Sequence, residues 1–266
     1  MRRLALVSVL AIACGAASAS PAQSLRLVYH KGDVYTYSYH ATANETINAV
    51  PVTYEVTGRH TYTVTSVDSV GTAELSLVVT DLVIKATANN ITNPIPSSSN
   101  PPIEITATAD GRVLSLSGRS QAPEADWAVL ADRTVKPGDT WSKDYDTATD
   151  GSGSVHLQTK STYLRVEAVQ GKSSSVVRTI ADLNLDETGV PLGPNIVGGS
   201  KIVSFQGTGT SDVTSWIDLN AHRLLKTHMT TTTDSTVSFG PPGTTMNGTS
   251  GPIRITAVIT VDLVPA

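Results

Sequence analysis

The sequence predicts an all-β protein: a large curved antiparallel sheet, either a half-barrel or a barrel, built from two similar repeats with one short helix between them. Three observations lead to this prediction. The 266-residue chain is dense in Thr and Val, whose branched side chains suit the pleated surface of a strand better than a helix. Several segments alternate apolar and polar residues with a period of two, as strands do. Two distant segments also open with the same turn.

The N-terminus has the features of an export signal. A basic start precedes the apolar run LALVSVLAIACGAA, and the small residues ASA follow as a cleavage pattern, so residues 1–19 are predicted to be a secretory signal peptide. The run is shorter than the roughly 20 apolar residues that cross a bilayer. Cys14 follows LAIA, which resembles a bacterial lipobox, so lipidation at Cys14 is the alternative to cleavage near residue 19. We expect an exported protein, whether periplasmic, secreted or at the cell surface, and either released or lipid-anchored.

The two repeats begin with related stretches, KGDVYTYSYH and KPGDTWSKDY. In each, a Gly-Asp pair typical of a turn feeds a strand with aromatic residues on one face. These residues are Tyr35, Tyr37 and Tyr39 in the first repeat and Trp141 and Tyr145 in the second. They are either an aromatic ladder that stabilises the sheet or a platform for a sugar or a lipid chain. We take all five as candidate ligand-binding residues.

Further segments recur in the same order. Residues 62–82 resemble residues 163–183, and residues 105–118 resemble residues 216–229. The earlier member of the second pair contains Asp-Gly between alternating runs, which is a strong hairpin signal. The predicted divisions are residues 1–19 for the signal peptide, 20–119 for the first β repeat, 120–132 for a short helical linker and 133–266 for the second β repeat.

The linker SQAPEADWAVLAD is the best helix candidate, because a proline near its start precedes acidic residues and then apolar ones. The chain ends with PIRITAVITVDLVPA, whose alternation predicts a long two-faced strand. A curled sheet has a concave face that must be filled, and we expect the helix with Trp127 to plug part of it. Any remaining volume would be an apolar pocket, so Trp127, Ala257 and Ile259 join the ligand-binding candidates.

Recognised catalytic and metal-binding motifs are absent from the sequence. There is no GxSxG, SxxK or HExxH motif, and the six histidines show no ligand spacing, so no catalytic residue, metal ligand or cofactor is predicted. The net charge of −4 and the lack of a basic stripe argue against nucleic-acid binding. Whether the protein is an enzyme stays open; a hydrolase that uses loop carboxylates is the least favoured alternative.

The KGDxYxY start, the stretch from Trp127 to Trp141 (WAVLADRTVKPGDTW) and the hairpin TADGRVLS resemble a family of uncharacterised exported bacterial proteins with two such β-units. The resemblance implies the fold and export but no catalytic residues. A curled antiparallel sheet with a small helix is also similar in plan to periplasmic lipoprotein carriers and mycobacterial lipid-binding lipoproteins.

Two functions follow from these observations. The first is an exported cell-envelope protein that binds an apolar ligand, a lipid or a lipidated partner, in the concave face of its sheet. The alternative is a structural module of the cell surface that interacts with an envelope protein or a glycan. In both, the only expected attachment to a membrane is a lipid on Cys14.

Overall fold

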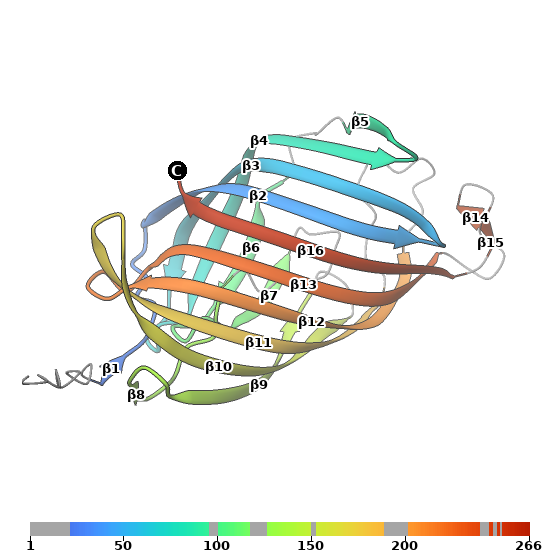
Figure 1. Ribbon diagram of the computed structural model, residues 1–266. Coiled ribbons are helices and arrows are strands. Elements are labelled where there is room, and N and C mark those ends of the chain that lie inside the picture. Colours follow the sequence, from blue (N-terminus) through green and yellow to red (C-terminus); the bar gives the residue numbers. More distant parts are fainter. Residues whose placement is uncertain are drawn as a thin grey trace, which may run out of the picture.

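The structure is a computed structural model that describes residues 22–95, 101–117, 127–149, 153–188, 202–239, 245–246, 249–250 and 252–266. All regular secondary structure in these ranges is β-strand, which confirms the predicted fold class (Figure 1). The predicted signal peptide and Cys14 lie outside the described residues. The described ranges contain no apolar helix of membrane-spanning length.

The main sheet closes on itself as a barrel of eleven strands. In the order in which they pair around the barrel, they are β2 (Val34–Ile47), β3 (Val50–Val67), β4 (Ala73–Ala88), β6 (Ile103–Ala107), β7 (Val113–Ser117), β9 (Thr140–Ala148), β10 (Ser154–Val169), β11 (Lys172–Thr188), β12 (Ile202–Asp218), β13 (Leu224–Phe239) and β16 (Ile253–Pro265). The last of these strands, β16, pairs with the first, β2. Its neighbours are antiparallel except β7 and β9, which meet in parallel at one residue pair, Ser115 with Ala148.

The remaining strands lie outside the barrel. They are β5 (Ile91–Ile95), which pairs with β4, and two small ladders, β1 (Gln23–Ser24) with β8 (Thr134–Val135) and β14 (Thr245–Met246) with β15 (Thr249–Ser250). The prediction left open whether the sheet is a half-barrel or a barrel. Because β4 pairs with both β6 and β3, the sheet is a closed barrel.

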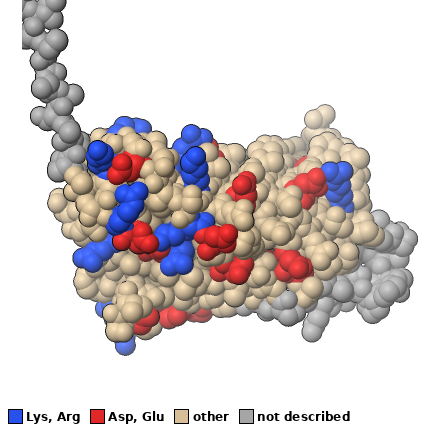
Figure 2. Space-filling model, turned by 90° about the horizontal axis from the view of Figure 1, so that it is seen from below, with Lys and Arg blue, Asp and Glu red and all other residues tan. Residues whose placement is uncertain are grey.

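The outer face of the barrel is polar. Threonines alternate there with charged residues, and ion pairs join neighbouring strands, as between Arg178 and Asp212 and between Arg254 and Asp234. Positive and negative groups are interspersed on the face in Figure 2, and neither sign forms a continuous patch there. The inner face therefore receives the apolar side chains of each strand, as the period of two predicts.

Two irregular segments, residues 25–30 and 127–133, bury Leu25, Leu27 and residues 127–131 inside the barrel. They lie at the end that carries the turns at residues 31–33, 108–112, 136–139 and 219–223. We call this end the turn end and the two segments the plug. Leu27 is 4% exposed and Trp127 5%, and their neighbours in the core come from several strands around the barrel. A barrel of eleven strands is wider than its own side chains can fill, since about eight strands are the limit for that. The plug fills the space at the turn end.

The helix predicted over residues 120–132 is wrong in its described part. Residues 127–132 are irregular, and residues 120–126 lie outside the described residues. The reason is enclosure: residues 127–131 are all buried, whereas a helical linker would expose one face to water. Side-chain hydroxyls of two strands accept the backbone N–H groups that a helix would bond internally. The N–H of Ala128 donates to Ser215 Oγ at 2.8 Å, and that of Val129 donates to Thr179 Oγ1 at 3.0 Å.

The two Gly-Asp turns have the same geometry. Gly32 has a φ of 92° and Gly138 a φ of 95°. The N–H of Gly32 donates to the carbonyl of Val64 at 2.9 Å, and that of Gly138 donates to the carbonyl of Tyr163 at 2.7 Å. Immediately after these two acceptors, β3 and β10 each shift register against the following strand. The turn geometry therefore matches Tyr163 with Val64, two residues beyond the tyrosine that sequence similarity aligns with it.

Candidate functional site

The five aromatic residues predicted from the repeat all lie on the inner face of the barrel. Tyr35 and Trp141 are each the second residue of their strand, β2 and β9. Tyr37 is 5% exposed and Tyr145 8%, so both belong to the core. The ring of Tyr39 stacks on the buried ring of His60, with centroids 4.2 Å apart. None of these rings is presented on the outer face.

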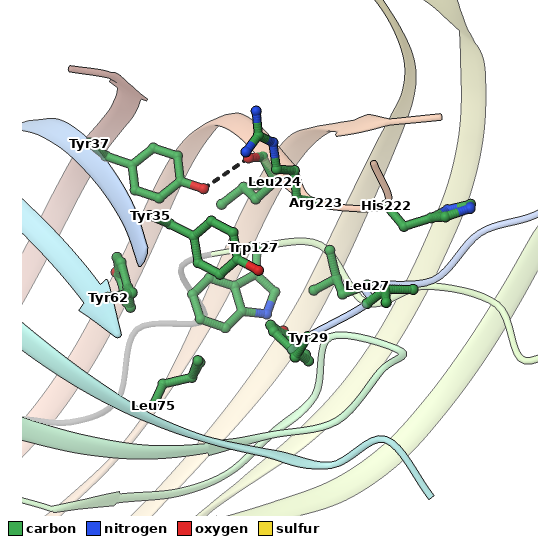
Figure 3. Close-up of a pocket in the computed structure, with 11 residues that line it drawn as sticks. Leu27, Tyr29, Tyr35, Tyr37, Tyr62, Leu75, Trp127, His222, Arg223 and Leu224 are labelled. Carbon is green, nitrogen blue, oxygen red and sulfur yellow. Dashed lines mark hydrogen bonds between the residues drawn. The ribbon is translucent and has the colours of Figure 1, made fainter. Parts of the chain in front are cut away.

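Three of the predicted residues, Tyr35, Tyr37 and Trp127, line one small cavity at the turn end (Figure 3). Its volume is about 30 Å³. The rest of its wall comes from the plug, from β3 and β4, and from the turn before β13, in the residues Leu27, Val28, Tyr29, Tyr62, Leu75, His222, Arg223 and Leu224. We call it the aromatic pocket. A buried water needs at least about 10–15 Å³ of such volume, so the pocket has room for small groups only.

Hydrogen bonds hold the rings of the aromatic pocket in place. The hydroxyl of Tyr37 donates to the carbonyl of Leu224 at 2.8 Å, as the dashed line in Figure 3 shows. The hydroxyl of Tyr35 donates to Asp33 Oδ2 at 2.8 Å. Burial raises the pKa of Tyr29, Tyr35 and Tyr37 well above the ordinary value, and the Asp33 carboxylate contributes further for Tyr35. The three hydroxyls therefore stay protonated at neutral pH.

Trp141 and Tyr145 lie in the core but do not line the aromatic pocket. Trp141 Nε1 donates to the carbonyl of Val129 at 3.1 Å, which fixes the plug. Tyr145 packs in a separate cluster with Val129 and Leu157, beneath the Arg112 guanidinium, which lies 5.8 Å from the centre of its ring. Trp141 thus packs against the same core cluster as Tyr35 and Tyr37, and of the five residues only Tyr145 lies in a different cluster.

Ala257 and Ile259 lie on the inner face of β16, nearer the end of the barrel away from the plug. The register places them beside Glu45 and Ala43 of β2. The inner face in this half carries apolar residues that remain half-buried: Ala43, Val52, Tyr54, Val56, Ile84, Ala86, Ile255 and Ile259. We call this region the open half. At the turn end, inner residues of the same strands are covered; Leu75 is 2% exposed and Leu263 0%.

Two carboxyl groups point inward away from the plug. Glu45 is half-buried beside Ala257, and Glu187 of β11 is 2% exposed. Burial raises the pKa of both above the usual range. Within the described residues, Glu187 Oε1 has no hydrogen-bond partner. The interior of this half is therefore largely apolar but includes two acidic groups.

A second concavity, of about 720 Å³, crosses the outer face of β2, β16, β13, β12 and β11. Its exposed lining residues have short polar side chains for the most part: Asn44, Thr46, Asp182, Thr208, Thr210, Thr232 and Asp234. Ala257 contributes to its floor, while the neighbouring Val258 points outward and is 43% exposed. We call it the outer groove.

Several residues of these sites were not predicted from the sequence. His60, which was not among the predicted site residues, is 5% exposed and stacks on Tyr39. His222 and Arg223, which were not among the predicted site residues either, both line the aromatic pocket. The one available signal was the difference between the corresponding hairpin turns, ADGR in the first repeat and NAHR in the second. Within the described ranges, no three His, Cys, Asp or Glu side chains are placed to hold a metal ion.

Comparison with known proteins gives little beyond the geometry. No protein-family model and no curated protein matches the chain. Among solved structures, one similar chain is that of a study of lipid–protein interactions in lipovitellin, with a TM-score of 0.41 and 15% sequence identity. The match covers 90% of this chain and 26% of the lipovitellin chain, so this protein spans about a quarter of that structure.

Proposed function

We propose that the protein is a non-catalytic binding protein that holds an apolar ligand, a lipid or a lipidated partner, in the open half of its barrel. One observation carries the proposal. Along β2, β3, β4 and β16 inner side chains such as Leu75 and Leu263 are covered at the turn end, whereas in the open half most inner apolar side chains stay half-buried and Ala257 is the exception at 5% exposed. An apolar surface that faces inward without being covered forfeits dispersion contacts and burial, and a bound apolar molecule restores both.

The size of the barrel supports the same proposal. Closed barrels of eleven strands enclose more than their own side chains. The described plug fills the turn end only. In the open half many inner residues are small, including Ala43, Ala86, Gly207, Gly209 and Ala257. A concave apolar space with a few polar groups, such as Glu45, is typical of ligand sites.

The ligand test compares neighbouring residues on opposite faces of β16. A fluorescent fatty acid should bind the wild-type protein saturably, and Ala257→Phe should raise its Kd at least tenfold, because the added ring occupies the open half. Val258→Phe adds the same ring to the outer groove and should leave the Kd unchanged.

As a control for folding, the melting temperatures of both variants should lie within a few degrees of that of the wild type. If Ala257→Phe unfolds the protein, Ala43→Phe is used instead. Absence of saturable probe binding to the wild type would end the proposal. The proposal would also end if Val258→Phe weakened binding of the probe and Ala257→Phe did not, since that result assigns the site to the outer groove.

Export forms part of the proposal and rests on the N-terminal sequence. Fractionation of a bacterial host should recover a protein shortened at its N-terminus outside the cytoplasm, and a full-length cytoplasmic product would contradict export. Cys14→Ser distinguishes the two modes of release: loss of membrane attachment indicates lipidation, and an unchanged distribution indicates ordinary cleavage.

We further propose that the barrel arose from duplication of a five-stranded unit, with β16 as the closing strand. The matched Gly-Asp turns and register shifts support this. So do the hairpins after β6 and β12, which shift register at Thr106 and Trp216. If the turns are equivalent, Gly32→Ala and Gly138→Ala should destabilise the protein equally; clearly unequal losses would count against it.

The second candidate function, an interaction module of the cell surface, is favoured by the outer groove alone. Its hydroxyl, amide and carboxylate groups suit a polar partner such as a glycan. The aromatic residues predicted as a platform face the interior, so they offer an external glycan no stacking surface.

A further inference from the structure

Arg223 stands out among the arginines that line enclosed space. It is half-buried at the aromatic pocket, in the turn between β12 and β13. Within the described residues, its guanidinium takes part in no hydrogen bond or ion pair. In Figure 3 the guanidinium lies on the side of the pocket formed by Tyr37 and Leu224. A guanidinium that is partly withdrawn from water and makes no hydrogen bond has donors available for an anion.

The corresponding arginine of the first hairpin shows what the second lacks. In each turn the first N–H donates to the carbonyl of the arginine: Thr108 N–H to that of Arg112 and Asp218 N–H to that of Arg223, each at 2.9 Å. The second turn is one residue longer than the first. Arg112 Nε donates to both carboxylate oxygens of Asp110 at 3.0 Å. The second turn reads NAHR in place of ADGR, so it supplies no carboxylate at that place.

Two carboxylates, Asp218 and Asp33, lie within a few residues of the pocket lining in the sequence. Both accept hydrogen bonds from other groups. Asp218 Oδ1 accepts the N–H groups of Asn220 and Ala221 at 2.9 and 3.0 Å. Asp33 Oδ2 accepts the hydroxyl of Tyr35 at 2.8 Å and the N–H of His30 at 3.1 Å. Against the effect of burial, the Ala221 and Asn220 N–H groups and the charges of Lys172 and Arg223 lower the pKa of Asp218. Asp218 therefore acts on Arg223 through its charge without a hydrogen bond, and neither carboxylate supplies the hydrogen-bonded partner that Asp110 provides to Arg112.

The chemistry of the pocket limits what the anion can be. Its wall beside Arg223 consists of the rings of Tyr29, Tyr35, Tyr37 and Trp127 and of aliphatic side chains. A guanidinium binds a planar carboxylate through two parallel hydrogen bonds. The volume of about 30 Å³ leaves room for a short apolar tail and excludes a long acyl chain.

We propose that the aromatic pocket is a second ligand site, independent of the open half, which binds a small monocarboxylate through Arg223 and takes its short apolar tail between Tyr37 and Trp127. The bound carboxylate would neutralise Arg223 in the second hairpin, as Asp110 neutralises Arg112 in the first. A small acid is favoured over a phosphate because a single charge is easier to withdraw from water.

Titration with butyrate, followed by the indole N–H signal of Trp127 in heteronuclear NMR, tests the site. Trp127 Nε1–H donates to the carbonyl of Gly111 at 2.8 Å beside the pocket, so its signal reports on occupancy. Comparison with Trp127→Phe assigns this signal. Butyrate should shift it saturably. Butyramide has the same shape without the charge and should bind at least tenfold more weakly.

Arg223→Gln should weaken butyrate binding at least tenfold, and Arg223→Lys, which keeps the charge but loses the fork, by less. The matched control Arg112→Gln should leave the Kd of butyrate unchanged. Equal binding of butyrate and butyramide, no saturable shift, or an Arg223→Gln variant that binds like the wild type would each overturn the proposal. The fatty-acid assay of the open half is unaffected by any of these results, so the two sites succeed or fail separately.

Discussion

Replacement of Trp127 by alanine should lower the free energy of unfolding by about 4 kcal/mol, within the range of about 3–5 kcal/mol for removal of a large buried aromatic residue. Trp127 is 5% exposed, and its ring meets that of Tyr62 edge to face with centroids 6.0 Å apart. Its loss leaves a void at the centre of the plug and removes the partner of the Gly111 carbonyl. Chemical denaturation followed by circular dichroism measures the effect.

Trp216→Ala provides the control, because Trp216 is half-exposed on the outer face of β12 with the Lys226 ammonium over its ring. Its indole N–H also donates to the Glu167 carboxylate. We expect this change to cost about 1–2 kcal/mol, because a surface cation–π pair and a part-buried hydrogen bond are lost without a void in the core. Equal losses for the two variants would show that the plug contributes nothing special to the core. That result would also contradict the division of the barrel interior into a turn end filled by the plug and an open half.

The strands and turns were predictable because they depend on local sequence. Alternation places Tyr35, Tyr37 and Tyr39 on one face whatever the sheet does globally, and the Gly-Asp pairs require a left-handed glycine at the turn. Closure of the barrel was not predictable. It depends on β4 pairing with β3 along most of its length and with β6 at its start, and such a division is set by the path of the whole sheet.

The plug shows the same limit in another form. The apolar residues around Trp127 have a spacing compatible with a helix, but the segment is enclosed, and the hydroxyls of Ser215 and Thr179 satisfy its backbone. These partners lie 87 and 50 residues away along the chain. The aromatic pocket combines the predicted tyrosines with Leu27 and with Arg223, which no local pattern associates with them. Sequence periodicity assigned residues to a face, and only the fold determined which faces meet.

The second large effect is expected at Gly111, where alanine should cost roughly 3 kcal/mol or more. Two penalties combine there. Gly111 has a φ of 83°, a conformation that costs an L-residue about 1–2 kcal/mol. A Cβ would also lie 2.8 Å from the carbonyl oxygen of Ala128 and 3.2 Å from Trp127 Cδ1, so the plug itself must move. Overpacking of this kind costs about 1–3 kcal/mol.

Gly32→Ala and Gly138→Ala isolate the first penalty, because these glycines have φ values of 92° and 95° and a Cβ at either would meet nothing within 4 Å. We expect each to cost about 1–2 kcal/mol from backbone strain alone. The excess at Gly111 then measures how tightly the plug presses on the first hairpin. If denaturation gives the same loss for all three variants, the plug yields to the added methyl group. It would then be too loosely held to form a firm wall for the aromatic pocket, and butyrate binding should be weak even in the wild type.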